Sequence, residues 1–167
     1  MAQAEHEFGP FFTPESEILI LGSFPSVKSR EKSFYYAHPQ NRFWRVLACC
    51  YGEDAPAQLD EKKSFLIRHR VALWDVIESC TVTGSSDASI RSAVPTDIEW
   101  LLSVTHIRRI ILNGRTAERY FNRFFPGFRL PTVTMPSTSP ANAAWSAEKL
   151  CEAWGSALII GEKTSGE

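Results

Sequence analysis

Long hydrophobic runs are missing from this sequence of 167 residues. No apolar stretch approaches the roughly 20 residues that a transmembrane helix needs, so we expect no contact with a membrane. The N-terminus, Met-Ala-Gln-Ala-Glu-His-Glu, is acidic and lacks a basic segment followed by an apolar one. That composition argues against a secretory signal. We therefore expect a cytoplasmic protein.

Cysteine is scarce, and its spacing is unsuited to a metal site. The sequence contains four cysteines, Cys49, Cys50, Cys80 and Cys151, with no Cys-x-x-Cys pair and no Cys/His cluster. Zinc sites and redox motifs are recognised by such spacings. We expect reduced and mostly buried thiols, as is usual in the cytoplasm, and no metal or other cofactor.

Neither sign of charge predominates, because 18 Lys and Arg oppose 19 Asp and Glu for a net charge of −1. This balance excludes a protein that coats nucleic acid through a strongly basic surface. Positive residues nevertheless gather in one segment, which contains Lys28, Arg30, Lys32, Arg42 and Arg45. Such a patch suits contacts with phosphates, although a solvated, charged loop is an equally good interpretation.

No repeat, low-complexity tract or linker divides the chain, so we predict a single domain over residues 1–167 with mobile ends, namely the first ten or so residues and the tail after Gly161. Apolar runs predict strands at 18–21, 71–74, 107–112 and 132–135. The segments between and after them predict helices at 42–50, 61–69, 97–103, 115–124 and 144–154. This alternation predicts an α/β fold, a three-layer α/β/α sandwich around a central, mainly parallel four-stranded sheet.

The segment from Ile18 to Leu47 contains most of the functional signals. A short apolar run ends in Gly22, and a polar loop follows, which we call the glycine loop. Three adjacent aromatics, Phe34-Tyr35-Tyr36, then precede a helix that is predicted to begin near Arg42. Ligands of open α/β sheets bind at the carboxyl ends of the strands. Aromatic rings beside hydroxyls and cations suit a flat heterocycle joined to an anion, so we expect a nucleotide.

Two motifs resemble those of the uracil-DNA glycosylase superfamily. Residues 37–44, Ala-His-Pro-Gln-Asn-Arg-Phe-Trp, and their spacing from Gly22 resemble the first motif of the mismatch-specific, Mug-type branch. Residues 135–142, Met-Pro-Ser-Thr-Ser-Pro-Ala-Asn, resemble the second motif of the superfamily, a loop that presses into DNA. The Tyr35-Tyr36 pair and the lack of Asn in the glycine loop are most similar to the hypoxanthine-DNA glycosylase (DNA-deoxyinosine glycosylase) branch.

The resemblance implies an enzyme of DNA repair. We expect a monofunctional DNA glycosylase that flips a deaminated base out of DNA and hydrolyses its N-glycosidic bond. Hypoxanthine is the first expected substrate. One alternative keeps the fold and makes uracil the main substrate, and another is a catalytically silent protein that binds damaged DNA. The expected partner is DNA containing deaminated bases, and the expected state is a monomer.

Asn41 is the expected catalytic residue. Where the Mug-type motif has an Asn that activates water, this chain has Phe24, whose ring can neither orient nor deprotonate water. The hypoxanthine branch is similar in lacking that Asn, so the resemblance implies that Asn41 replaces it. An amide can hold a water and a carbonyl at the same time. The alternative role of Asn41 is to cap the helix that begins near Arg42.

Four residues are expected to contact the flipped base. Tyr36 aligns with the aromatic that stacks on the base in the Mug-type motif, and its alternative is a half-buried tyrosine of the core. Asp75 ends a predicted strand where uracil-specific relatives have a base-reading Asn. Its carboxylate can accept the ring N–H of hypoxanthine or uracil, and its alternative is a helix cap or a buried ion pair. Ser23 and Phe24 of the glycine loop complete the set.

DNA contacts are expected from the second motif and from the glycine loop. The hydroxyls of the second motif suit phosphate oxygens, and its last residue is expected near the gap that the flipped base leaves. Cations of the glycine loop would face further phosphates. The residues expected to contact DNA are Ser137, Thr138, Ser139, Asn142, Lys28 and Arg30.

Overall fold

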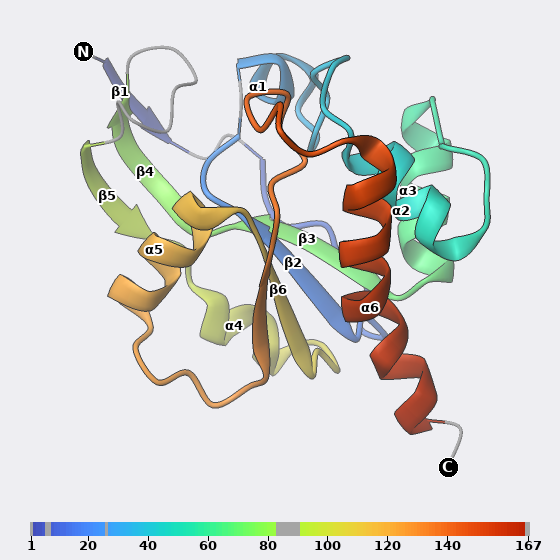
Figure 1. Ribbon diagram of the computed structural model, residues 1–167. Helices are drawn as coiled ribbons and strands as arrows, with labels where there is room; N and C mark the ends of the chain where they lie inside the picture. The colour runs from blue at the N-terminus through green and yellow to red at the C-terminus, as the bar shows by residue number, and fades with distance from the viewer. Residues whose placement is uncertain (1, 6–7, 26, 83–90, 166–167) are drawn as a thin grey trace.

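The computed structural model of the protein describes residues 2–5, 8–25, 27–82 and 91–165 (Figure 1). At its centre is a sheet of four strands in the order β3-β2-β6-β7, and every neighbouring pair in it is parallel. Its strands are β2 (Ile18–Gly22), β3 (Val71–Asp75), β6 (Arg109–Asn113) and β7 (Thr132–Met135). The predicted parallel sheet is therefore confirmed.

Helices cover both faces of this sheet. They are α1 (Val27–Lys32), α2 (Phe43–Tyr51), α3 (Leu59–Arg68), α4 (Ile98–Ser103), α5 (Arg115–Phe124) and α6 (Ala147–Ser165). Figure 1 shows α4 and α5 on one side of the sheet and α2, α3 and α6 on the other. The strand order steps from β2 to β3 in one direction and from β6 to β7 in the other, and right-handed crossovers then put the helices on opposite faces. The three-layer sandwich is confirmed. No helix in the described part of the chain is long and apolar enough to cross a membrane.

The central strands are apolar because they are covered on both sides. Every residue of β2 and β3 is buried, as is the middle of β6. Continuous apolar runs are typical of such parallel strands. The same burial extends to the polar residue that ends β3, Asp75, which is only 3% exposed.

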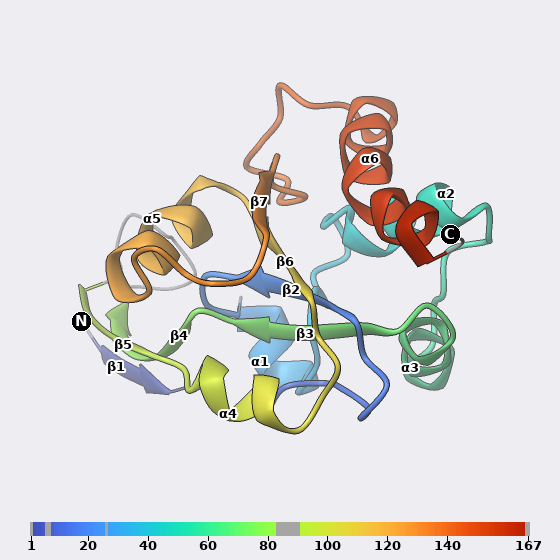
Figure 2. The same ribbon diagram turned by 90° about the horizontal axis from the view of Figure 1, so that it is seen from below.

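The sequence pattern does not predict the second sheet, which is antiparallel with the order β1-β4-β5. Its strands are β1 (Ala2–Glu5), β4 (Ile77–Val82) and β5 (Arg91–Pro95). Figures 1 and 2 show it at the end of the molecule away from α6. The pairing of β4 with β5 is irregular in register, and this irregularity weakens the alternation by which strands are recognised. Both ends that we expected to be mobile contribute to elements, namely β1 and the last turn of α6.

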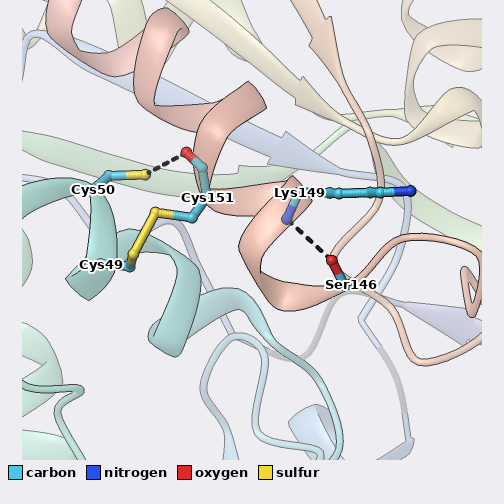
Figure 3. The surroundings of a disulfide bond; sticks show 5 residues. All are labelled: Cys49, Cys50, Ser146, Lys149 and Cys151. Atoms are coloured by element: carbon cyan, nitrogen blue, oxygen red, sulfur yellow. Dashed lines mark hydrogen bonds between the residues drawn. A yellow bond between two sulfur atoms is a disulfide. The ribbon is translucent and has the colours of Figure 1, made fainter.

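The expectation of four reduced thiols is wrong for two of them, because Cys49 of α2 and Cys151 of α6 form a disulfide (Figure 3). The two helices pack against each other, and the two Cα atoms are 6.2 Å apart although 102 positions separate them in the sequence. Cys50 and Cys80 are free thiols, and the Cys50 Sγ donates to the carbonyl of Cys151 over 3.4 Å. The spacing of the cysteines in the sequence does not show that Cys49 and Cys151 lie close together in the fold. Among the described residues, no three His, Cys, Asp or Glu side chains gather where they could hold a metal ion.

Candidate active site

The two motifs meet at one edge of the four-stranded sheet. Register pairs Gly22 with Asp75 and Asn113 with Met135, while β2 and β6 lie side by side. Because all four strands are parallel, the loops that follow their carboxyl ends gather at the same edge. The glycine loop leaves β2 there, and the second motif leaves β7. The two motifs are thus brought together at this edge of the sheet.

Arg42 fastens the first motif to the second. Its backbone N–H and its Nε donate to the carbonyl of Thr138 over 3.1 and 3.4 Å. Its guanidinium also donates to the carbonyls of Ser139 (2.8 Å), Asn142 (3.1 Å) and Trp145. A guanidinium offers five donors in one plane, so it can hold several carbonyls of a single loop. The inward direction of Arg42 does not support a phosphate-facing role for this residue.

Asn41 lies at the junction of the two motifs. Its Oδ1 accepts from the backbone N–H of Phe43 over 3.0 Å and from the hydroxyl of Thr138 over 2.8 Å. The first bond satisfies an N–H in the opening turn of α2, where N–H groups have no partner within the helix. The N-cap position itself is occupied by Arg42 without a side-chain bond, so Asn41 accepts from the first residue of α2 from one position before the cap, and its catalytic role stays a prediction. Asn41 also lines an open cleft of about 810 Å³, together with Tyr36.

Thr138 links Asn41 to the end of β6. Its backbone N–H donates to Oδ1 of Asn113 over 3.1 Å, and Nδ2 of Asn113 donates to the Thr138 hydroxyl oxygen over 3.1 Å. We call Asn41, Asn113 and Thr138 the Asn41 cluster. Thr138 is 0% exposed, so its geometry gives it an internal role and offers no surface for a phosphate.

Tyr36 has an unusual backbone and a buried hydroxyl. Its φ is +53°, a region that residues other than glycine rarely adopt. One face of its ring stacks on Phe43, with centroids 3.9 Å apart. Its hydroxyl is buried and has no hydrogen-bond partner among the described residues. Burial, followed by the charge of Asp75, raises the pKa of Tyr36 well above its usual range, although the nearby Asn113 amide opposes this shift. Tyr36 is therefore a neutral phenol at physiological pH.

Asp75 and Tyr36 converge over Gly22. A Cβ at position 22 would lie 2.5 Å from Oδ1 of Asp75 and 3.2 Å from the hydroxyl oxygen of Tyr36. Only glycine fits there, because any side chain would displace one of the two polar groups. The backbone carbonyl of Asp75 accepts from the buried hydroxyl of Thr96 over 2.8 Å, which fixes the end of β3. We call Gly22, Tyr36 and Asp75 the Gly22 corner.

Three of the other residues expected to act from the glycine loop, Ser23, Phe24 and Arg30, are half-buried. The Ser23 carbonyl accepts from the backbone N–H of Ile77 over 3.0 Å, which ties the loop to β4. The guanidinium of Arg30 lies over the ring of Phe24, 5.6 Å from its centroid, in a cation–π contact. Lys28 belongs to α1, but its side chain lies outside the described residues. Base contact by Ser23 and Phe24, and DNA contact by Lys28 and Arg30, stay predictions.

The remaining expected residues of the second motif form hydrogen bonds within their own loop. The Ser137 hydroxyl oxygen accepts from the N–H of Ser139 over 3.1 Å, and the Ser139 hydroxyl oxygen accepts from the N–H of Ala141 over 3.2 Å. Asn142 Nδ2 donates to the carbonyl of Ser137 over 3.0 Å. Both hydroxyls keep a proton that can be donated to a phosphate. Ser137, Ser139 and Asn142 line a second cleft of about 580 Å³, so their DNA contacts stay a prediction.

Three residues support the site in ways that the sequence does not indicate. Arg42 looks like a phosphate ligand because it is a cation within a basic segment. Asn113 comes directly before Gly114, and this position is equally typical of a turn. Trp154 of α6 donates its ring N–H to the carbonyl of Pro136 over 2.9 Å and so supports the second motif from behind. Nothing in the local sequence around Trp154 signals that contact.

Comparison with known proteins bears on this site. Residues 10–157 match the family described as the Uracil DNA glycosylase superfamily. A relative named hypoxanthine DNA glycosylase, from Methanosarcina acetivorans, is 37% identical over 139 residues, which cover 82% of this chain and 87% of the relative. Another of the same name, from Methanosarcina barkeri, is 32% identical over 115 residues, 68% of this chain and 73% of the relative. The solution NMR structure of a candidate uracil DNA glycosylase from Methanosarcina acetivorans has a TM-score of 0.79 at 32% identity and covers 93% of this chain and 96% of its own.

The fold, the two adjoining motifs and these relatives define a DNA glycosylase, a hydrolase that acts on N-glycosyl bonds. The chain belongs to the uracil-DNA glycosylase superfamily. The resemblance carried by residues 37–44 and 135–142, including its likeness to the hypoxanthine branch, is confirmed. Membership favours the enzyme over the catalytically silent DNA binder.

Proposed function

We propose that the protein removes hypoxanthine, the product of adenine deamination, from DNA. The observation that carries this proposal is the Gly22 corner, where the Asp75 carboxylate and the Tyr36 hydroxyl approach one buried point. Two relatives named hypoxanthine DNA glycosylase, at 37% and 32% identity, support the same substrate. The protein would act on DNA as a monomer in the cytoplasm, without a metal or another cofactor.

The chemistry of the Gly22 corner suits the edge of hypoxanthine that pairs in DNA. Hypoxanthine presents a ring N–H beside a carbonyl oxygen. An ionised carboxylate such as that of Asp75 only accepts hydrogen bonds, whereas the neutral phenol of Tyr36 has a proton to donate. The N–H would donate to Asp75, and the carbonyl would accept from Tyr36.

Adenine offers the opposite pattern, with a ring nitrogen that only accepts and an amino group that only donates. The Asp75 carboxylate would then face the ring nitrogen, acceptor against acceptor, so a hydrogen bond to a charged group worth about 1.5–3 kcal/mol would not form, whereas the Tyr36 hydroxyl could turn and accept from the amino group. Sites built in this way discriminate strongly against the mismatched analogue. Uracil, however, has the same N–H beside a carbonyl, so the Gly22 corner also favours uracil as a second substrate.

Cleavage would follow extrusion of the base from the helix. Asn41 is assigned to catalysis at the junction of the two motifs, and the phosphates of the DNA would stabilise the sugar as it becomes cationic. The hydroxyls of Ser137 and Ser139 would hold those phosphates. The stacking on the flipped base that the resemblance implies for Tyr36, through the ring face opposite Phe43, is an alternative to its hydrogen bond with the base carbonyl, because a ring that lies flat on the base cannot also donate in the plane of that base. Such stacking is worth about 1–3 kcal/mol.

The test is cleavage of end-labelled duplexes that each contain one hypoxanthine, uracil, xanthine or normal base. Alkali added after incubation breaks the strand wherever a base has been removed. We expect breaks at hypoxanthine, fewer at uracil, and only slow, trace removal of normal bases such as adenine. Efficient removal of uracil without any removal of hypoxanthine would overturn the substrate assignment.

A further inference from the structure

Two backbone N–H groups fix the direction of every hydrogen bond in the Asn41 cluster. The N–H of Thr138 can only donate, so the atom of Asn113 that it meets at 3.1 Å is the oxygen. Nδ2 of Asn113 therefore faces the Thr138 hydroxyl and donates to it over 3.1 Å. Because the hydroxyl oxygen accepts that bond, its own proton is directed to Oδ1 of Asn41, 2.8 Å away.

The second backbone group acts on Asn41 itself. The N–H of Phe43 can also only donate, and it meets Asn41 at Oδ1 over 3.0 Å. An amide oxygen has two lone pairs, and Phe43 and Thr138 occupy both of them. The amide nitrogen, with its two protons, is the part of Asn41 left for a ligand in the cleft that this residue lines.

We propose that Thr138 and Asn113 are positioning residues that orient Asn41 as a hydrogen-bond donor to the attacking water. This inference rests on the proposed glycosylase function. Two bonds accepted at Oδ1 polarise the amide and strengthen its N–H groups as donors. Asn41 thus holds the water by its oxygen and takes no proton from it.

The reaction balances without a base at Asn41. The bond from C1′ to the base nitrogen breaks, and its electron pair leaves with the base. The water oxygen, held by the Asn41 amide, then forms a bond to C1′. The proton that the water loses goes to the departing base.

The substitution Asn41→Asp separates a donor from a proton acceptor. Aspartate keeps an oxygen for Phe43 and Thr138, but it replaces the NH₂ group with a second acceptor that is also a better base. We expect excision of hypoxanthine in single turnovers to fall by about 10²–10³, the cost of removing one aligned donor, at neutral and at alkaline pH alike. Activity of Asn41→Asp equal to or above that of the wild type would overturn the inference.

A matched pair tests the positioning residue. Thr138→Val keeps the shape of the side chain and removes the hydroxyl, while Thr138→Ser keeps the hydroxyl. We expect Thr138→Val to lower the excision rate at least about tenfold, the equivalent of one hydrogen bond, while its affinity for DNA stays unchanged. Thr138→Ser should recover most of the excision rate. Equal rates in the two variants would show that Thr138 only packs.

A spectroscopic measurement keeps this inference separate from the proposed function. In the DNA-free, ¹⁵N-labelled protein, the Asn41 side-chain amide is identified by its loss in Asn41→Ala. We expect its two N–H resonances to shift in Thr138→Val and to stay in place in Thr138→Ser. If the wild type excises no base while this pattern appears, the function fails and the orientation of Asn41 stands. If the two N–H resonances of Asn41 stayed in place in Thr138→Val, the inference would be overturned whatever the activity.

Discussion

The Asn41 cluster and the Gly22 corner lie at the same edge of the same sheet, yet their polar groups differ in whether they are hydrogen-bonded within the protein. In the cluster, both lone pairs of Asn41 Oδ1 and both ends of the Asn113 amide are bonded within the protein. In the corner, the Tyr36 hydroxyl is buried and lacks a partner within the described ranges. Such an orphan costs about 1–3 kcal/mol. This cost is removed if a bound ligand supplies the missing hydrogen bond to the Tyr36 hydroxyl.

This difference suggests a division of labour. The Asn41 cluster joins the two motifs, and its hydrogen bonds fix the orientation of the Asn41 amide before DNA binds. It therefore suits cleavage of the N-glycosidic bond, the step that every substrate shares. The corner spans two neighbouring strands and offers one acceptor and one donor, so it suits the choice of base. The predictions that follow would break or sharpen this division.

Removal of the Asn41 amide, for which we propose the catalytic role, is expected to have the largest effect. Asn41→Ala would lower the rate of hypoxanthine excision by about 10²–10³, equivalent to about 3–4 kcal/mol of transition-state stabilisation. Binding of hypoxanthine-containing DNA should persist, because the corner is intact. Gel-shift titration beside single-turnover kinetics measures the two quantities. Loss of binding together with turnover would show that the cluster and the corner are one unit.

Reduction of the disulfide comes next in size. Cys49–Cys151 joins α2, which follows Asn41, to α6, whose Trp154 supports the second motif. Opening a native disulfide that closes a long loop costs about 2–4 kcal/mol of unfolding free energy. We expect Cys49→Ser to lower the urea midpoint to the same value as a reductant, and a reductant to have no further effect on that variant. A midpoint that is insensitive to both would contradict this expectation.

Asp75→Asn would change the choice of base more than the rate. The amide can turn an N–H group toward the ring nitrogen of adenine, and it gives up a hydrogen bond to a charged acceptor that is worth about 1.5–3 kcal/mol. Excision of hypoxanthine should fall by roughly 10- to 100-fold, while the preference for hypoxanthine over adenine narrows. Rates measured on matched duplexes report both quantities. An unchanged preference would remove Asp75 from base recognition.

Tyr36→Phe is expected to have the smallest effect and an unusual sign in stability. The ring and its stacking on Phe43 stay, while a buried hydroxyl without a partner is lost, so unfolding free energy should hold or rise. The specificity constant for hypoxanthine should fall by about tenfold, the value of one neutral hydrogen bond. Thermal denaturation and steady-state kinetics check the two signs. A less stable variant with full activity would make Tyr36 a residue of the fold alone.

The layers of the fold were predictable because burial on both faces leaves a strong local signal. Residues 18–21 and 71–74 are continuous apolar runs, and they correspond to β2 and β3 almost residue for residue. The second sheet leaves no such signal, because β4 continues from β3 after one residue and pairs irregularly with β5.

The site was predictable in its location and not in its bonding. The first motif and the end of a predicted strand place Asn41, Tyr36 and Asp75 near the edge where the strands end, and each lies there, while their roles in the reaction stay predictions. The bond between Asn41 and Thr138 spans 97 positions, so only the folded chain shows it. A threonine in a Pro-Ser loop and an arginine in a basic segment resemble phosphate ligands. Their inward direction follows from packing.

The measurement that tests the division of labour most directly is selectivity, the ratio of the rates of hypoxanthine and adenine removal from matched duplexes in single turnovers. It is compared in the wild type, Asp75→Asn and Thr138→Val. We predict that Asp75→Asn lowers this ratio, whereas Thr138→Val slows both reactions and leaves the ratio unchanged. A ratio that changes in Thr138→Val and holds in Asp75→Asn would contradict this prediction.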